Sequence, residues 1–366
     1  MHKDDLMTPR ERANAFARGE EPDRMPIVLG YGAAAGDLLG LDYDDWREKP
    51  GLRAKVAVNA YNEFGYDGVS TTYDTDALVE LFGGELCVNR RGPNAVQRPP
   101  VADLRDLGML DLDLVCSDKD YTFQHTSEVF HRLKDALGDE LPQIGFGIEA
   151  PLTLAARFAG TGYILKSILR RAELVRPLLE FFTALVIKVH SFFVSETASF
   201  TVFDAVSSGS LISPRIYQEF SLPYEKRIFD ALKEKRSDVS IHLHICGNTQ
   251  KILLPMVSTG ADIISMDEAV KLETAKQLIG DKVILSGNVP TMAVILQGGP
   301  VDVDRSIRDC FAQAYDSPRG FSISAGCAIP PGTPIANMRQ FMATARECAR
   351  IHARGKNLSP ASFFNA

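Results

Sequence analysis

Short apolar runs recur along the chain, and each of them ends at turn-forming or polar residues. Runs of this length that are rich in β-branched residues predict strands. Eight of them are found, at 26–31, 68–74, 143–149, 200–205, 240–246, 261–267, 282–288 and 320–327. Helical patterns separate most of these runs, for instance at 151–158, 172–197, 213–235, 249–258, 269–278 and 304–316, and a final helix is expected at 334–354.

The alternation of strands and helices predicts the fold class. Strands that are mostly continuous apolar runs and that alternate with helices indicate a parallel sheet. Eight such units in 366 residues predict an α/β protein with a (β/α)₈ TIM barrel, and an open doubly wound sheet is the alternative. We expect one barrel domain over 1–354, a frayed arm at 1–8 and a loose tail at 355–366.

One segment interrupts the alternation of predicted strands and helices. Residues 83–125 contain short alternating runs, prolines and charges, and the next helical pattern comes only at about 126–137. We interpret 83–125 as an insertion at the barrel mouth, in the form of a β-hairpin flap.

Charge and composition narrow the function classes. The net charge of −7 argues against a nucleic-acid surface, which would need a basic excess. No apolar run reaches 18 residues and no basic, apolar leader opens the chain, so neither a membrane span nor a signal peptide is expected. Six cysteines lie far apart, which favours reduced thiols and a cytoplasmic protein.

Polar residues end nearly every predicted strand. Active sites of (β/α)₈ barrels lie at the carboxyl ends of the strands. Helix capping explains some of these residues, but a ring that contains carboxylates, an imidazole and two sulfurs exceeds what capping needs. The candidates are Asp74, Glu149, Asp204, His244, Cys246, Asp267, Asn288 and Cys327.

The stretch "SIHLHICG" at 240–247 suggests a metal. Alternate residues of a strand share one face, so His244 and Cys246 can chelate together. Cys327, 81 residues later, would reach across the mouth through a turn in which Gly326 permits an unusual backbone angle. Three such ligands and one open position fit a catalytic zinc site.

Ordinary burial is the alternative for each of these residues, since cysteine is often buried and a buried histidine usually has a hydrogen-bond partner. His242, one layer deeper on the same face, is expected to be a hydrogen-bonded barrel histidine. The remaining cysteines, Cys87, Cys116, Cys310 and Cys348, are assigned to packing or surface, and His125 and His131 to no shared site.

Several motifs together resemble a known family. They are "TPRERANAFARGEEPDRMPI", "EAPLTLAARFAGT", "VFDAVSSGSLISPRIYQEFSLPYEKRI", "LHICGNT", "VILSGNV" and "SAGCAIPPGTPIANM". The chain is similar to the uroporphyrinogen decarboxylase superfamily, and within it to zinc-dependent, corrinoid-linked methyltransferases such as methylcobamide:coenzyme M methyltransferases. The resemblance implies a (β/α)₈ barrel and a zinc site made of His244, Cys246 and Cys327.

Two departures from the decarboxylases favour the methyltransferase branch. Decarboxylases of this superfamily carry an arginine-rich motif after the first strand, whereas this chain has no basic residue between Arg24 and Arg47. They also have a histidine at the position of Cys327. Asp74 matches their central aspartate and does not discriminate.

The resemblance implies that a methyl group passes between a small substrate and the cobalt of a corrinoid. It further implies that this substrate is a thiol such as coenzyme M or a methoxy compound. The chain has no Asp-x-His-x-x-Gly motif, so a transient partner protein is expected to supply the corrinoid. A metal-free decarboxylase and a non-catalytic zinc-binding barrel are the alternatives.

Supporting roles follow from position alone. Asp267 is expected to orient His244 or to occupy the open zinc position, and Glu149 and Asp204 to position substrate or move a proton. Asp74 and Tyr73 are pocket candidates, and Tyr73 and Asn288 are candidates for cofactor binding.

Overall fold

The structure is a computed structural model that describes residues 5–17, 20, 22–138 and 144–354. The predicted tail at 355–366 lies outside the described residues. The elements are α1 (Pro9–Ala17), η1 (Gly32–Leu39), α2 (Tyr43–Trp46), α3 (Pro50–Phe64), β1 (Ser70–Thr72), α4 (Thr75–Leu81), β2 (Glu85–Cys87), β3 (Ala95–Arg98), α5 (Tyr121–Leu137), β4 (Ile144–Glu149), α6 (Pro151–Ala159), α7 (Thr161–Arg170), α8 (Ala172–Phe193), β5 (Thr197–Phe203), η2 (Ala205–Ser207), α9 (Pro214–Phe220), α10 (Leu222–Lys235), β6 (Ser240–Ile245), α11 (Leu253–Val257), β7 (Ile263–Met266), α12 (Leu272–Ile279), β8 (Ile284–Ser286), η3 (Thr291–Leu296), α13 (Pro300–Ala314), β9 (Phe321–Ser322) and α14 (Ile335–Arg354).

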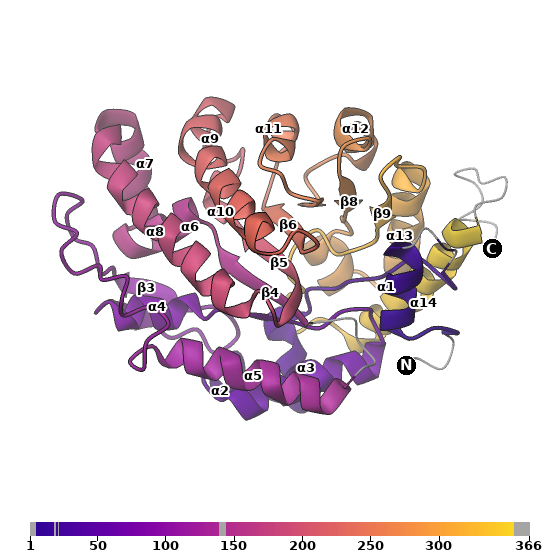
Figure 1. Ribbon diagram of the computed structural model, residues 1–366. Coiled ribbons are helices and arrows are strands. Elements are labelled where there is room, and N and C mark those ends of the chain that lie inside the picture. Colours follow the sequence, from indigo (N-terminus) through magenta and orange to yellow (C-terminus); the bar gives the residue numbers. More distant parts are fainter. Residues whose placement is uncertain (1–4, 18–19, 21, 139–143, 355–366) are drawn as a thin grey trace.

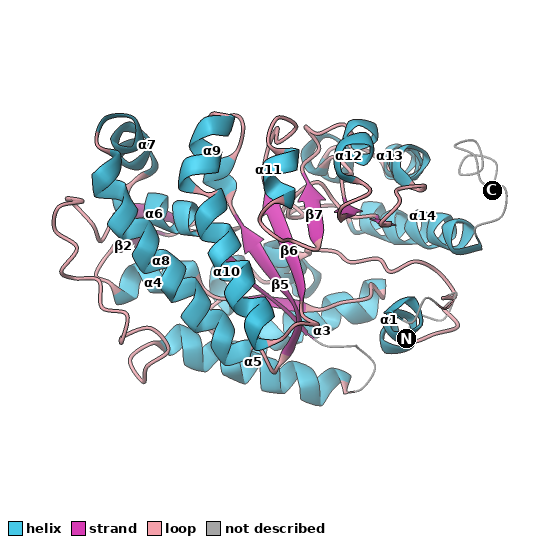
Figure 2. Cartoon of the chain, turned by 45° about the horizontal axis from the view of Figure 1, so that its top comes forward, coloured by secondary structure: helices cyan, strands magenta, loops and turns pink. Residues whose placement is uncertain are grey.

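The main sheet is parallel and follows the order of the chain. Over the described ranges it contains seven strands in the order β1-β4-β5-β6-β7-β8-β9, and every pairing in it is parallel. Helices cover its outside, with α8 and α10 running along the strands (Figures 1 and 2). A sheet whose neighbours are also neighbours in sequence is the arrangement of a (β/α)₈ barrel, which confirms the predicted fold class.

The first predicted strand is an exception. Segment 26–31 forms no strand in the described structure, and Pro26 has no N–H to contribute to a ladder. The segment nevertheless bonds to both edges of the sheet. The N–H of Asp67, just before β1, donates to the Ile27 carbonyl (2.7 Å), and the Ser322 hydroxyl of β9 donates to the Pro26 carbonyl (3.4 Å). The predicted strand is therefore wrong in conformation, although the segment lies between the two edges.

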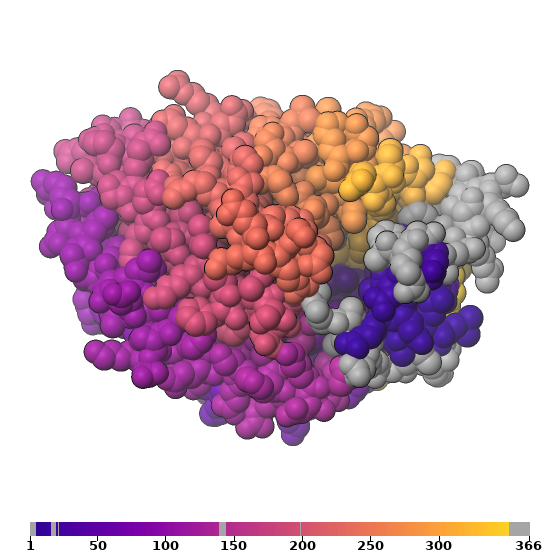
Figure 3. All heavy atoms as spheres, in the orientation of Figure 1, coloured from indigo at the N-terminus to yellow at the C-terminus, as the bar shows by residue number. Residues whose placement is uncertain are grey.

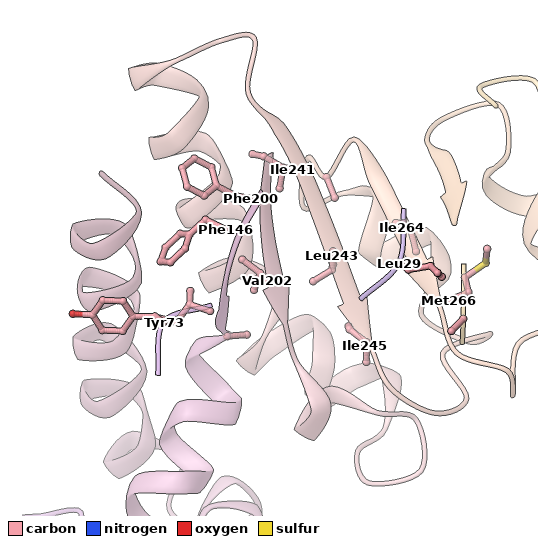
Figure 4. Packing of buried hydrophobic residues seen from close by; sticks show 14 of the residues in the cluster. Leu29, Tyr73, Phe146, Phe200, Val202, Ile241, Leu243, Ile245, Ile264 and Met266 are labelled. Carbon is pink, nitrogen blue, oxygen red and sulfur yellow. The ribbon is translucent and has the colours of Figure 1, made fainter. Parts of the chain in front are cut away.

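The hydrophobic core lies between the sheet and the helices. Phe146, Phe200, Val202, Leu243 and Ile264 are fully buried there and project from neighbouring strands (Figure 4). The alternate residues of the same strands face the other side, the lumen of the sheet, and most of them are only half-buried. Several of these lumen residues are polar: Thr201, His242, Ser265, Ser286 and Ser322. The lumen is therefore reached by solvent and lined partly by hydroxyl groups.

The predicted insertion contains the expected hairpin. Strands β2 and β3 pair antiparallel, apart from the main sheet. The hairpin turn is held by the Tyr43 N–H, which donates to the Arg90 carbonyl (2.8 Å). Helix α5 begins at Tyr121, with Asp120 as its N-cap, so the irregular stretch ends earlier than the predicted 125. The extent of the insertion as a unit stays a prediction.

The predicted helix over 213–235 is two helices, α9 and α10, that meet at Ser221. Pro223 lies in the first turn of α10, where its missing N–H has no intrahelical partner to lose. Continuing α9 through this proline would remove a helical hydrogen bond.

The opening residues are anchored by a buried ion network where they are described. Asp5 accepts two hydrogen bonds from Arg24 (2.8 and 2.7 Å), and Arg24 also donates to Asp67 (2.5 Å). Arg12 pairs with both Asp23 and Asp67. Arg12 and Arg24 are 0% exposed. The expected frayed arm is therefore wrong from Asp5 onward, because these charges fix the first helix beside the chain's last helix, α14 (Figures 1 and 3).

The helices give no sign of a membrane span. In the part of the chain that the structure describes, none is both long enough and apolar enough to cross a bilayer.

His190 of α8 is a buried base in the core. Its ring lies between those of Phe146 and Phe200, with centroids 5.4 and 4.5 Å away, and neither ring nitrogen has a hydrogen-bond partner among the described residues. Burial lowers the pKa of His190 to about 3. In the unfolded chain His190 therefore binds a proton near pH 6.5, whereas in the folded chain it stays neutral at that pH. The free energy of unfolding consequently falls as the pH drops below about 6.5.

Replacing His190 with leucine should remove this acid sensitivity. Between pH 8 and pH 5 the wild type should lose about 2 kcal/mol more unfolding free energy than the variant. Urea unfolding at both pH values measures the difference. Equal losses in the two proteins would show that His190 is protonated in the folded state.

Candidate metal centre

Two ligand candidates project from the end of β6, and a third approaches from beyond β9. The His244 Nε2 and Cys246 Sγ atoms lie 3.4 Å apart, and the sulfurs of Cys246 and Cys327 lie 3.7 Å apart. All three ligand atoms lie within 4.8 Å of one another. His244 is buried and both cysteines are half-buried. The sequence therefore identified residues that the tertiary structure brings together.

Cys327 reaches this position because the chain after β9 crosses the neighbouring loops closely. Val289 and Ala325 form an isolated parallel bridge that extends the pairing of β8 and β9. At Gly326 an added Cβ would lie 2.8 Å from the backbone nitrogen of Glu268. The predicted reason for this glycine is wrong, because its φ is not positive. The position needs glycine because the loop after β7 leaves no room for a side chain.

The spacing of the three donors fits a single zinc ion. Zinc binds sulfur at about 2.3 Å and nitrogen at about 2.0–2.1 Å; a tetrahedron with these bonds sets two sulfurs about 3.8 Å apart, and sulfur and nitrogen about 3.5 Å apart. The measured separations are 3.7 and 3.4 Å. Two sulfurs and one imidazole nitrogen can thus hold zinc with one tetrahedral position left for another molecule.

Ser265 orients the imidazole. Its Oγ lies 3.1 Å from His244 Nδ1, and β6 and β7 pair so that the two residues are directly opposite. An Nδ1–H donated to this hydroxyl leaves the Nε2 lone pair directed at the sulfurs. Ser265 makes the contact with the ring that was predicted for Asp267. One carboxylate oxygen of Asp267 accepts the N–H of Ala269 (2.9 Å) in the turn after β7. The pKa of Cys246, which its hydrogen bond with Cys327 raises most, is raised further by the charge of Asp267, so a role for Asp267 beside the metal stays a prediction. A serine at this position carries no sequence signal until the register of β6 and β7 is known.

The two thiols contact each other and differ in acidity. The hydrogen bond with the Cys246 thiol lowers the pKa of Cys327. The hydrogen bond to Cys327 and burial raise the pKa of Cys246. Of the two thiols, Cys327 is therefore the more acidic.

Glu149 and Asp204 occupy different environments at the ends of β4 and β5. Burial raises the pKa of both carboxyl groups. Glu149 is half-buried, 3.5 Å from Arg157. Asp204 is 0% exposed and accepts hydrogen bonds from Thr153 (2.6 Å) and Ser207 (2.5 Å). Asp204 is enclosed by protein and cannot touch a substrate in this arrangement, whereas Glu149 stays a candidate for positioning one.

Asp74 and Tyr73 have structural partners in place of a pocket. Asp74 is the N-cap of α4, where it accepts the N–H groups of Asp76 and Ala77, and its other oxygen accepts a bond from Arg47 (3.1 Å). Tyr73 is buried on the helix side of the sheet (Figure 4) and donates to Asp120. The alternation of β1 directs Tyr73 away from the lumen, so the expectation that it lines a pocket or binds cofactor is wrong.

Asn288 is also a structural residue. Its amide donates to the carbonyls of Asp267 (3.0 Å) and Val270 (2.7 Å), and it is 8% exposed. It therefore fixes the loop after β7, on which Gly326 packs, and its predicted contact with a cofactor is not supported by this geometry.

The other cysteines and histidines lie outside the cluster. Cys310 and Cys348 are buried, Cys116 is half-buried and Cys87 is exposed, as predicted. His131 contacts the Ser127 carbonyl (2.7 Å) and His125 packs on Tyr121.

His242 faces the lumen, where burial lowers its pKa to about 4. Its ring has no hydrogen-bond partner among the described residues, so the partner expected for it is not found.

The fold and the cluster together define an α/β protein with a candidate metal centre at the carboxyl ends of its parallel strands. The profile of the Uroporphyrinogen decarboxylase (URO-D) family matches residues 8–348, and the chain belongs to this family. This membership confirms the resemblance predicted from the motifs.

Relatives of both branches are similar to nearly the whole chain. Methylcobamide:CoM methyltransferase MtbA of Methanosarcina mazei is 31% identical over 353 residues, which cover 94% of this chain and 98% of the relative. Uroporphyrinogen decarboxylase of Parasynechococcus marenigrum is 28% identical, with 90% and 94% covered. The solved structure of a methyltransferase from Methanosarcina mazei superposes with a TM-score of 0.81 at 23% identity, over 93% of this chain and 98% of that one, and shows the same fold.

Proposed function

We propose that this protein is a zinc-dependent methyltransferase that moves a methyl group between the cobalt of a corrinoid protein and a small thiol such as coenzyme M. The observation that carries the proposal is the convergence of the ligand atoms of His244, Cys246 and Cys327 to within 4.8 Å of one another. Similarity to relatives named methylcobamide:CoM methyltransferases, at 31% and 30% identity, supports the reaction class and favours a thiol over a methoxy compound.

Each residue of the candidate metal centre has its own role in the proposed reaction. When bound, zinc would supply a Lewis acid that lowers the pKa of a thiol substrate and holds it as a thiolate. Cys246 and Cys327 contribute two negative charges, which leave the centre near neutral and so do not weaken the nucleophilicity of a third sulfur. His244, fixed by Ser265, directs its nitrogen at the same point.

The corrinoid comes from a partner protein in this proposal. The sequence has no Asp-x-His-x-x-Gly motif, the loop with which many corrinoid proteins present a histidine to cobalt. Purified protein should therefore carry no cobalamin absorbance. A stable stoichiometric cobalamin would contradict this part of the proposal.

The test is methyl transfer from methylcobalamin with a panel of acceptors. Zinc-loaded protein should methylate 2-mercaptoethanesulfonate. Methylation that persists after zinc removal would refute the proposal. A parallel assay with methoxyaromatics and the reduced corrinoid tests the opposite direction, and release of carbon dioxide from uroporphyrinogen would identify a decarboxylase.

Replacing Ser265 with alanine should weaken zinc binding without destroying the site. Loss of an outer hydrogen-bond partner of a metal-bound histidine lowers metal affinity about 10- to 100-fold. Competition with a chromophoric chelator measures the change. The matched control is Ser258→Ala, an exposed serine of the same region. Unchanged zinc affinity in Ser265→Ala would show that His244 is held by packing alone.

A further inference from the structure

The two sulfurs of the candidate metal centre lie in direct contact. The Sγ atoms of Cys246 and Cys327 are 3.7 Å apart. A disulfide holds its sulfurs about 2.05 Å apart, so these two atoms have to approach by roughly 1.7 Å to form one. Rotation about the Cα–Cβ bonds of two cysteines can supply a movement of this size. The arrangement that suits zinc is therefore also close to that of a sulfur–sulfur bond.

The backbone on both sides of this contact lies outside the regular elements. Cys246 is the first residue after β6, and Cys327 lies between the Val289–Ala325 bridge and α14. Gly247, with a φ of +74°, follows Cys246, and glycine changes its backbone angles at low cost. A small shift of one cysteine toward the other therefore leaves the strand ladders and the helices intact.

The other four cysteines have different surroundings. Over the residues that the structure describes, none of the four has a second sulfur in contact: Cys310 and Cys348 are buried, Cys116 is half-buried beside the Tyr73 hydroxyl, and Cys87 is exposed on the hairpin. The pair at the metal centre is half-buried, so solvent and small oxidants can reach it. Formation of an intramolecular disulfide is therefore specific to this pair.

Zinc binding and a disulfide exclude each other at this site. Zinc binds cysteine as the reduced, deprotonated thiolate. A disulfide removes two of the three donors and leaves only His244. A metal that binds one form of a protein and not the other stabilises the form that it binds. Bound zinc should therefore protect the two thiols from oxidation, and a disulfide should prevent zinc from binding.

We infer that Cys246 and Cys327 form a reversible disulfide in the metal-free protein, so that a peroxide closes the metal centre and a dithiol reductant reopens it. As a form of regulation this inference rests on the proposed function, because it acts by removing ligands of the zinc that the reaction uses. The disulfide itself can be measured without any assay of activity.

The oxidation balances with hydrogen peroxide as the oxidant. One sulfur attacks the peroxide, the O–O bond breaks, and a sulfenic acid and one water molecule form. The second sulfur then attacks the sulfenic sulfur, the S–S bond forms, the S–O bond breaks, and a second water molecule leaves. The two thiols lose two electrons to the peroxide, and their two protons end in the water. A dithiol such as dithiothreitol reverses the change by thiol–disulfide exchange.

The test counts thiols in chelator-treated wild type before and after hydrogen peroxide. The oxidised protein, once denatured, should have lost two of its six thiols, and non-reducing peptide mapping should recover the peptides of Cys246 and Cys327 linked together. This protein should bind no zinc, and dithiothreitol should restore both the thiols and zinc binding. Zinc-loaded wild type should keep all its thiols under the same treatment.

The matched control is Cys116→Ser, which removes a thiol that is half-buried like the pair and should leave the linkage unchanged. Cys246→Ser should form no intramolecular link. A wild type that keeps its thiols, or a link that maps to another pair of cysteines, would overturn the inference. Neither of these two outcomes depends on whether a variant folds.

The zinc and methyl-transfer measurements separate this inference from the proposed function. A disulfide that forms in a protein that neither binds zinc nor transfers a methyl group would support the thiol pair and refute the proposed function. Zinc-dependent methyl transfer by a protein whose metal-free thiols resist peroxide would refute the disulfide alone.

Discussion

Replacing Cys327 with alanine should abolish zinc binding and methyl transfer while the protein stays folded. The variant loses one of three metal donors. Only two protein ligands, His244 and Cys246, would then remain for zinc, and solvent could compete for the metal. We expect zinc affinity to fall by more than about 100-fold, the upper end of the loss seen when only an outer partner is removed. Metal analysis after dialysis and the methylcobalamin assay measure the two effects.

The control for this prediction is Cys87→Ala. Cys87 is exposed on the hairpin, and its removal should change neither zinc content nor activity. Far-UV circular dichroism should be the same for both variants, because Cys327 is half-buried in a loop and contributes little to the core. Full zinc occupancy in Cys327→Ala would remove this residue from the metal centre.

Replacing Asp67 with asparagine should cause a large loss of stability. Asp67 accepts bonds from both Arg12 and Arg24, and both guanidinium groups are 0% exposed. Arg12 keeps Asp23 and Arg24 keeps Asp5 as partners, so the variant loses the charged acceptor of two buried hydrogen bonds, which should reduce the free energy of unfolding by about 3 kcal/mol. Asp67 also accepts the Ile27 N–H (2.6 Å), so the segment at 26–31 should loosen with it. Urea unfolding at neutral pH measures the loss.

An exposed ion pair provides the comparison. Asp230 pairs with Lys226 along α10 (3.0 Å), and both side chains are about half exposed. Asp230→Asn should change the free energy of unfolding by no more than about 0.5 kcal/mol. Similar losses in Asp67→Asn and Asp230→Asn would mean that the buried network adds no stability.

The site residues could be predicted from the sequence where metal-binding residue types occupy positions on the same face of a predicted strand. His244 and Cys246 are two residues apart in an apolar run, so their shared face follows from the strand geometry alone. Cys327 was predicted because it ends another such run. By contrast, Tyr73 and Asn288 also end predicted strands, and the structure assigns them to the helix layer and to a loop.

Position at a strand end was a weaker guide to function than residue type. Asp74, Asp204 and Asp267 were selected by the same reasoning as the metal ligands. In the structure Asp74 caps a helix and Asp204 is enclosed by hydroxyl donors, whereas Asp267 lies close enough to the cluster to raise the pKa of Cys246. A carboxylate satisfies backbone N–H groups at many strand ends, so its presence there says little about chemistry.

The sequence by itself determined the α/β class, most of the order of strands and helices, and the three residues of the candidate metal centre, because each is encoded in local periodicity and residue type. Only the tertiary structure decided which side chains meet. The register of β6 with β7 selected Ser265 for His244, and the close approach at Gly326 brought Cys327 to Cys246. The polar lumen likewise became visible only when alternate residues of separate strands faced one space, because contacts between distant segments depend on packing that no local pattern specifies.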